Sequence, residues 1–160
     1  LTMSAWVFPN VLYNGSVGGA NGVISKRTDT NIESEYNLSL WQRNHAWAVV
    51  DGDQVLDRLE GTATVMIMRW IQLTLVYDGT QIQDQRMHLY INGALDAVHG
   101  ETSAMIPSYN STLHVGCMPA PGAEGGPLEQ AFVGRIDEVV IWNRALSEAE
   151  VTQWYTATKP

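Results

Sequence analysis

The chain has 160 residues, of which 45% are apolar and 16% charged, and its formal net charge at pH 7 is −8. That length and composition are typical of one folded domain and exclude a disordered chain. The acidic charge argues against a nucleic-acid partner, because binding to phosphates depends on clustered Lys and Arg, and the nine basic residues here are scattered. No apolar run approaches the roughly 20 residues of a membrane span, so we expect no membrane insertion.

Most apolar stretches alternate with a period of two, which predicts half-buried β-strands. In the first stretch, one face carries four apolar side chains: Leu1, Met3, Ala5 and Val7. Further strands are predicted at residues 22–26, 36–41, 45–50, 65–68, 70–77, 86–91, 112–116 and 132–142. The dipeptide Asn92-Gly93 indicates a tight type I′ hairpin turn. We therefore predict a single all-β domain, a two-sheet antiparallel β-sandwich.

A short helix is predicted directly after the last strand. Ser147 can accept hydrogen bonds from the first free N–H groups, and Glu150 can reach back to the backbone of Ser147, which is the capping-box pattern. Leu146 and Val151 are spaced as a hydrophobic staple across the start of the helix. The sandwich should therefore end in a short C-terminal helix.

Four segments resemble a known family and follow one another in that family's order. Residues 132–150 read FVGRIDEVVIWNRALSEAE, and they closely resemble the end of the laminin G-like jelly-roll modules in the concanavalin A-like lectin and glucanase superfamily. Residues 2–7 (TMSAWV), 70–79 (WIQLTLVYDG) and 89–93 (LYING) are similar to an early strand, a central strand and a following hairpin. The resemblance implies two stacked, curved sheets. It also implies a non-catalytic extracellular appendage of an enzyme or adhesin that often binds carbohydrate.

The beginning of the chain departs from the family pattern. Family members usually carry one or two strands ahead of the early Trp segment, whereas this chain opens on that segment at Leu1. We expect that residues 1–160 form one domain that lacks its N-terminal strands, and that the chain is part of a larger protein or a mature form. An incomplete sheet would expose edge N–H and C=O groups that favour pairing with another segment.

The sequence lacks the motif that catalysis in this superfamily requires. The resemblance implies that the glycan-cleaving enzymes of the superfamily carry a Glu-x-Asp-x-x-Glu motif, which places two carboxylates on one face of a strand. No such motif occurs in this sequence. Glu33 and Glu35 have the spacing of a pair, but they lie in a polar segment without a strand pattern. We therefore predict that the protein is not an enzyme.

Asp137 is the candidate metal ligand. The resemblance implies that an Asp at this place in the last strand often completes a structural calcium site with backbone carbonyls from elsewhere. The alternative is an Asp bonded to backbone N–H groups. A second acidic stretch, Asp51 to Glu60, does not fit a calcium loop, because Val55 and Leu56 occupy positions that need an oxygen ligand and a Gly. We interpret that stretch as a solvated acidic turn.

Aromatic side chains supply the candidate carbohydrate site. Sugar binding needs indole or phenol rings that pack on the C–H faces of pyranoses, with polar groups to bind the hydroxyls. Trp41 and Trp47 lie outside the family-like segments, and Arg43 and His45 lie beside them, so these four residues are the predicted site. Packing within the sheet is the alternative role for both Trp residues. By contrast, Trp154 is expected to dock the helix on the sandwich.

These observations favour a non-catalytic carbohydrate-binding or adhesion module of a secreted or cell-surface protein. Its partner would be a glycan or another protein domain, and one structural Ca²⁺ is its only expected cofactor. The alternative is a structural module that pairs with another subunit and binds no sugar.

Overall fold

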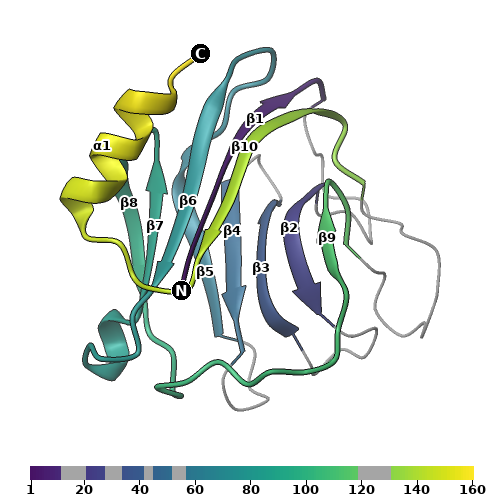
Figure 1. Ribbon diagram of the computed structural model, residues 1–160. Helices are drawn as coiled ribbons and strands as arrows, with labels where there is room; N and C mark the ends of the chain where they lie inside the picture. Colours follow the sequence, from purple (N-terminus) through teal and green to yellow (C-terminus); the bar gives the residue numbers. More distant parts are fainter. Residues whose placement is uncertain (12–20, 28–33, 42–44, 52–56, 119–130) are drawn as a thin grey trace.

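The computed structural model describes residues 1–11, 21–27, 34–41, 45–51, 57–118 and 131–160. Within these ranges the chain forms two antiparallel sheets of five strands each and a C-terminal helix (Figure 1). The two-sheet antiparallel sandwich predicted from the sequence is confirmed.

Strand order shows how the two layers are built. Sheet A contains, in spatial order, β10 (Gly134–Trp142), β1 (Thr2–Pro9), β6 (Ile71–Tyr77), β7 (Met87–Ile91) and β8 (Ala94–His99). Sheet B contains β5 (Asp57–Thr64), β4 (His45–Val50), β3 (Ser34–Leu40), β2 (Asn21–Arg27) and β9 (Leu113–Val115). A short 3₁₀ helix, η2 (Gln83–Gln85), precedes β7. The helix α1 (Glu148–Thr158) follows β10.

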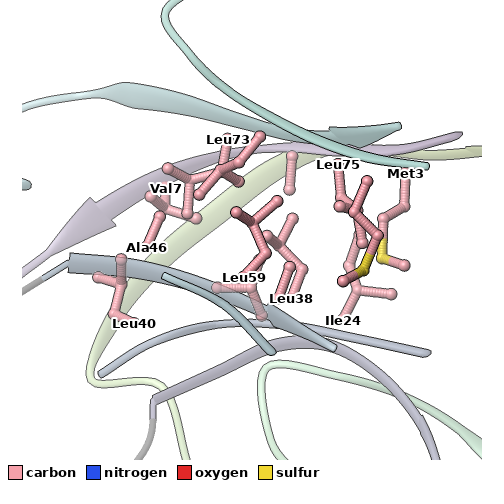
Figure 2. Close-up of a cluster of buried hydrophobic side chains, with 14 of the residues drawn as sticks. Met3, Val7, Ile24, Leu38, Leu40, Ala46, Leu59, Leu73 and Leu75 are labelled. Atoms are coloured by element: carbon pink, nitrogen blue, oxygen red, sulfur yellow. The ribbon is translucent and has the colours of Figure 1, made fainter. Parts of the chain in front are cut away.

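The core lies between the two sheets, where alternate side chains of each strand meet. Figure 2 shows apolar side chains from both layers packed against one another. Sheet A contributes Met3, Val7, Leu73 and Leu75, and sheet B contributes Ile24, Leu38, Leu40, Ala46 and Leu59. The period-two pattern of the sequence thus places one apolar set inside and leaves the other set on an outer face.

Helix α1 covers the outer face of sheet A (Figure 1). The indole of Trp6 stacks on Tyr155 with ring centroids 5.5 Å apart, and Trp142 meets Trp154 edge to face at 5.2 Å. Both faces of β1 are therefore buried, which explains why Trp6 is only 3% exposed. The predicted docking role of Trp154 is confirmed.

The predicted start of the helix is also confirmed. Ser147 accepts a hydrogen bond from the N–H of Glu150, and the Glu150 carboxylate accepts one from the N–H of Ser147. Leu146 and Val151 are buried in the layer between the helix and sheet A. With 11 residues the helix has three turns.

The hairpin between β7 and β8 follows from two residues with positive φ. Asn92 has φ 53° and Gly93 φ 76°, as a type I′ turn requires, so the predicted turn is confirmed. Asn92 Oδ1 also accepts a hydrogen bond from the N–H of Gln72 at 2.9 Å. A side chain on Gly93 would approach Tyr155 of the helix to 2.9 Å, so this glycine permits the helix to pack on the hairpin.

Two predictions about residues 51–70 are wrong. The acidic stretch interpreted as a turn contains strand β5, although its residues 52–56 lie outside the described ranges. Residues 65–68 form no strand, because the chain turns at residues 67–68, where Met68 has φ 57°. Strand β5 contributes a single large apolar side chain, Leu59, to the core. An edge strand with so little apolar content gives almost no alternation signal.

Candidate functional site

The outer face of sheet B carries residues of the predicted carbohydrate site. On β4, Ala46, Ala48 and Val50 point into the core, so strand alternation directs His45 and Trp47 outward. On β3, Leu38 and Leu40 point inward, and Ser39 lies opposite Trp47 on the outer face. The same alternation that fills the core therefore presents aromatic and polar side chains on this face.

Trp41 and Trp47 form a stacked pair. Their ring centroids lie 4.9 Å apart and their planes differ by 26°. Trp41 follows the last residue of β3, and its N–H donates a hydrogen bond to the carbonyl oxygen of His45 at 2.9 Å. This bond joins the two ends of the connection between β3 and β4, so the indole of Trp41 lies against that of Trp47. Both residues are half-buried.

Strand β5 adds two charged residues beside this pair. Glu60 lies opposite Trp47 in the β4–β5 register, and Arg58 lies opposite Val49. The guanidinium carbon of Arg58 lies 5.5 Å from the centroid of the Trp47 ring, a cation–π distance. Nδ1 of His45 lies 3.1 Å from Oε1 of Glu60. Trp47 is thus contacted by Trp41 and Arg58, which reach it from the strands on either side of β4.

Buried polar side chains continue this face across β3 and β2. Asn37 and Ser25 lie opposite each other in the register, and they are 2% and 0% exposed. Asn37 Nδ2 donates to the sulfur of Met118 at 3.7 Å. Within the described ranges, neither Asn37 Oδ1 nor Ser25 Oγ has a hydrogen-bond partner. The aromatic pair therefore adjoins a row of polar groups with unused hydrogen-bonding capacity.

Glu35 is engaged in a buried ion pair at one end of the same sheet. Its Oε2 lies 2.5 Å from Lys26 Nζ, and its Oε1 accepts hydrogen bonds from the N–H of Tyr109 and the hydroxyl of Ser111. The carboxylate side chain is only 4% exposed. It therefore connects residues 109–111 to sheet B. Glu33, which has the spacing of a catalytic pair with Glu35, lies outside the described ranges.

The structure brings together three of the four predicted carbohydrate-site residues. Trp41, Trp47 and His45 lie side by side on the outer face of sheet B, and Arg43 falls outside the described ranges. Sequence reasoning missed the roles of Arg58 and Glu60, because β5 was not recognised as a strand. Once β5 is aligned with β4, alternation around the inward Leu59 directs both residues to the outer face.

Asp137 lies on the other sheet, at a bulge in β10. Asp137 pairs with Trp6 of β1, and the β1–β10 register shifts between Ser4 and Trp6. The next residue, Glu138, has φ 48°. Asp137 Oδ1 accepts a hydrogen bond from the N–H of Glu138 at 2.8 Å. Among the described residues no group of three His, Cys, Asp or Glu side chains could hold a metal ion. The calcium site predicted at Asp137 stays a prediction.

The arrangement of sheets, connections and terminal helix is that of a jelly-roll β-sandwich. Comparison with protein families gives the same class: the chain belongs to the concanavalin A-like lectin/glucanases superfamily, whose model matches residues 1–152. The laminin G-like resemblance inferred from the sequence is confirmed. A comparison with curated proteins returned no match.

Solved structures agree on the fold. The CBM40 domain of the Ruminococcus gnavus IT-sialidase bound to α2,3 sialyllactose is 15% identical, with a TM-score of 0.72 and coverage of 96% of this chain and 81% of that one. A heptameric SAP-like pentraxin from Limulus polyphemus is 15% identical, with a TM-score of 0.69 and coverage of 98% and 70%. Domain 4 of an extracellular arabinanase from Geobacillus stearothermophilus, in complex with arabinotriose, is 19% identical, with a TM-score of 0.60 and coverage of 95% and 64%.

Within the described residues, no helix has the length and apolar character needed to cross a bilayer.

Proposed function

We propose that the protein is a non-catalytic carbohydrate-binding module of a secreted or cell-surface protein, and that it binds glycan on the outer face of sheet B. The observation that carries this proposal is the stacked pair of Trp41 and Trp47, with His45, Arg58 and Glu60 around it. Indole rings pack against the C–H faces of pyranoses, and the polar groups beside them bind hydroxyls. The pair is assembled by backbone and ring contacts of the protein itself, so little ordering remains for a ligand to impose.

The structural neighbours support the same proposal. A CBM40 domain bound to sialyllactose and an arabinanase domain in complex with arabinotriose share this fold. Two of these neighbours are parts of enzymes that act on glycans, and one of those enzymes is extracellular. This setting supports an appended module outside the cell.

The carboxylates of the site face support a binding role over a catalytic one. Glu35 is bonded to Lys26, Tyr109 and Ser111, and Glu60 is paired with His45. Glycoside hydrolysis needs two carboxyl groups directed at one glycosidic bond. Here both of these carboxylates, Glu35 and Glu60, are bonded to neighbours within the protein.

Glycan-array screening followed by calorimetry of the best ligand tests the proposal. Trp47→Ala and Trp41→Ala should each weaken binding by about tenfold or more, as aromatic residues at the centre of a binding site do. Trp70→Ala is the matched control, because Trp70 is a half-buried indole packed on Phe8 in sheet A. If the chain binds no glycan, or if the Trp70 variant loses as much affinity as the others, the proposal is wrong.

The second candidate, an assembly module, is favoured by one observation at the opposite edge of sheet B. Leu113 and Val115 on the edge strand β9 are 45% and 50% exposed. Exposed apolar side chains on an edge strand favour pairing with another segment. Light scattering over a range of concentrations distinguishes the candidates: reversible oligomers without glycan binding would support assembly, and a monomer that binds glycan would exclude it.

The calcium proposal concerns the pocket around Asp137, which Trp6, Trp70, Glu138 and Thr158 also line. Asp137 and Glu138 offer carboxylate oxygens, the ligands that Ca²⁺ prefers, and further oxygens would have to come from carbonyl groups. A bound ion stabilises the native state, so a chelator should lower the melting temperature of the protein purified with calcium. An unchanged melting temperature, or an equal decrease in the Asp137→Asn variant, would exclude the ion from this site.

A further inference from the structure

Arg58 is a cation that contacts an aromatic ring and has no ion pair among the described residues. Its side chain is exposed on the edge strand β5, and its guanidinium carbon lies 5.5 Å from the centroid of the Trp47 ring. No hydrogen bond or ion pair joins this guanidinium to the rest of the described chain. Its five N–H donors therefore stay available beside the aromatic pair.

Two other arginines, Arg144 and Arg86, use their donors within the protein, whereas Arg135 resembles Arg58 in its contact with an aromatic ring. Arg144 binds both carboxylate oxygens of Glu150, at 2.7 and 3.1 Å. Arg86 donates to three backbone carbonyls. Arg58 has an acidic neighbour on its own face, Glu60, but that carboxylate is paired with His45. Within the described part of the chain, Arg58 is thus a cation without a hydrogen-bonded or ion-paired partner at the edge of the proposed glycan site.

Acidic side chains near Arg58 are engaged elsewhere. Asp57 accepts a hydrogen bond from the N–H of Thr102 at 3.2 Å. Asp96 on β8 accepts three hydrogen bonds from Thr62 and Ala63 of β5. The carboxylates of Asp57 and Asp96 are therefore engaged by other groups, and the Asp96 bonds connect the edges of the two sheets.

We propose that Arg58 binds the carboxylate of an acidic sugar whose ring lies against the Trp41–Trp47 pair; this inference rests on the proposed function. A planar guanidinium matches a carboxylate with two parallel hydrogen bonds, and such charge-assisted pairs are stronger than neutral ones. The contact with Trp47 orders the Arg58 side chain before the ligand arrives, which lowers the entropy lost on binding.

The charge of the whole chain gives this residue a particular importance. With a net charge of −8, the protein repels an anionic ligand at long range, so an acidic sugar is held only where a local cation outweighs that repulsion. Glu60 lies two residues from Arg58 on the same face and disfavours a carboxylate at its own position. The ligand's carboxylate is therefore directed to the Arg58 end of the site, and its neutral hydroxyls to the end formed by Glu60 and His45.

Sialic acids and uronic acids both carry a ring carboxylate, so the experiment includes both sources. Calorimetry would compare 3′-sialyllactose and a galacturonic acid oligosaccharide, each beside its carboxyl-reduced form. The acidic form of at least one of them should bind about tenfold more tightly than the reduced form, and added salt should diminish that preference. The sugar that shows the preference identifies the source of the carboxylate.

Two variants locate the effect. Arg58→Gln should abolish the preference, so that the variant binds the acidic and the reduced forms with equal affinity. Arg135→Gln is the matched control, because it removes the same charge and the same kind of contact, with Phe8 at 5.2 Å on sheet A, and it should keep the preference. Equal binding of acidic and reduced sugars, or equal effects of the two variants, would overturn the inference. That result leaves the proposed function intact, whereas failure of every sugar to bind would overturn both.

Discussion

Replacing Glu35 by Gln tests whether its ion pair stabilises the sheet that carries the site. The bonds to Tyr109 and Ser111 end on Oε1, and the bond to Lys26 ends on Oε2. A Gln placed with its oxygen at the Oε1 position keeps the first two bonds and turns its NH₂ group toward the Lys26 ammonium. The substitution therefore leaves a cation, 22% exposed, facing a donor in place of an acceptor.

The cost follows from the burial of the two partners. Breaking a fully buried pair costs roughly 3–5 kcal/mol, but Lys26 retains contact with water, so we expect Glu35→Gln to lower the free energy of unfolding by about 2 kcal/mol. Adding Lys26→Met removes the unpaired cation, and the double variant should recover about 1 kcal/mol of that loss. Urea unfolding followed by Trp fluorescence measures these differences. Asp84→Asn, an exposed acid in η2, is the control and should change stability by less than about 0.5 kcal/mol.

A loss below about 0.5 kcal/mol for Glu35→Gln would refute this account of the pair. So would a double variant that is less stable than Glu35→Gln alone, because the remaining cation would then have contributed nothing to the loss.

Three further predictions concern the core, the hairpin and the helix. Leu38→Ala should lower the free energy of unfolding by about 2–5 kcal/mol in urea, since Leu38 is fully buried between the sheets; a loss under 1 kcal/mol, on the order of a surface change, would contradict the assigned packing. Gly93→Ala should lower the melting temperature, because the residue has φ 76° and the new side chain would meet Tyr155 at 2.9 Å; an unchanged melting temperature would contradict this helix position. Hydrogen bonds from Arg144 and Ser147 lower the pKa of Glu150 from 4.5 to about 2. Because the folded-state pKa is the lower one, the ionised carboxylate stabilises the fold above about pH 4.5, and this contribution is lost as the pH falls toward 2. Glu150→Gln should therefore show a weaker decrease in melting temperature between pH 5 and pH 3, and an unchanged pH profile would contradict the assignment.

Much of the fold could be predicted because its signals are local. The capping box at Ser147 and the turn at Asn92-Gly93 depend on neighbouring residues alone, and both form as expected. Alternation in residues 1–8 identified a strand and assigned its two faces. What alternation could not show is that both faces of this strand are buried, because the second layer is the helix, whose position depends on residues about 150 positions away.

The parts that were missed depend on pairing between distant segments. Strand β5 has one large inward side chain, and it is ordered by hydrogen bonding to β4 and by Asp96 of β8. The bulge in β10 places Glu138 at a positive φ that no sequence rule assigns to Glu. At the site, the two indoles could be selected because they lay outside the family-like segments. Arg58 could not, because its place beside Trp47 exists only once β5 pairs with β4.

The most direct test of the central claim is to observe the six indole N–H signals of the chain by NMR while the best glycan of the array is added. Each signal is assigned by replacing one Trp at a time with Phe. The account predicts that the signals of Trp41 and Trp47 shift in proportion to occupancy. Those of Trp142 in β10 and Trp154 in the helix that packs on sheet A should stay in place. Shifts at Trp142 and Trp154 with unchanged signals from Trp41 and Trp47 would contradict it.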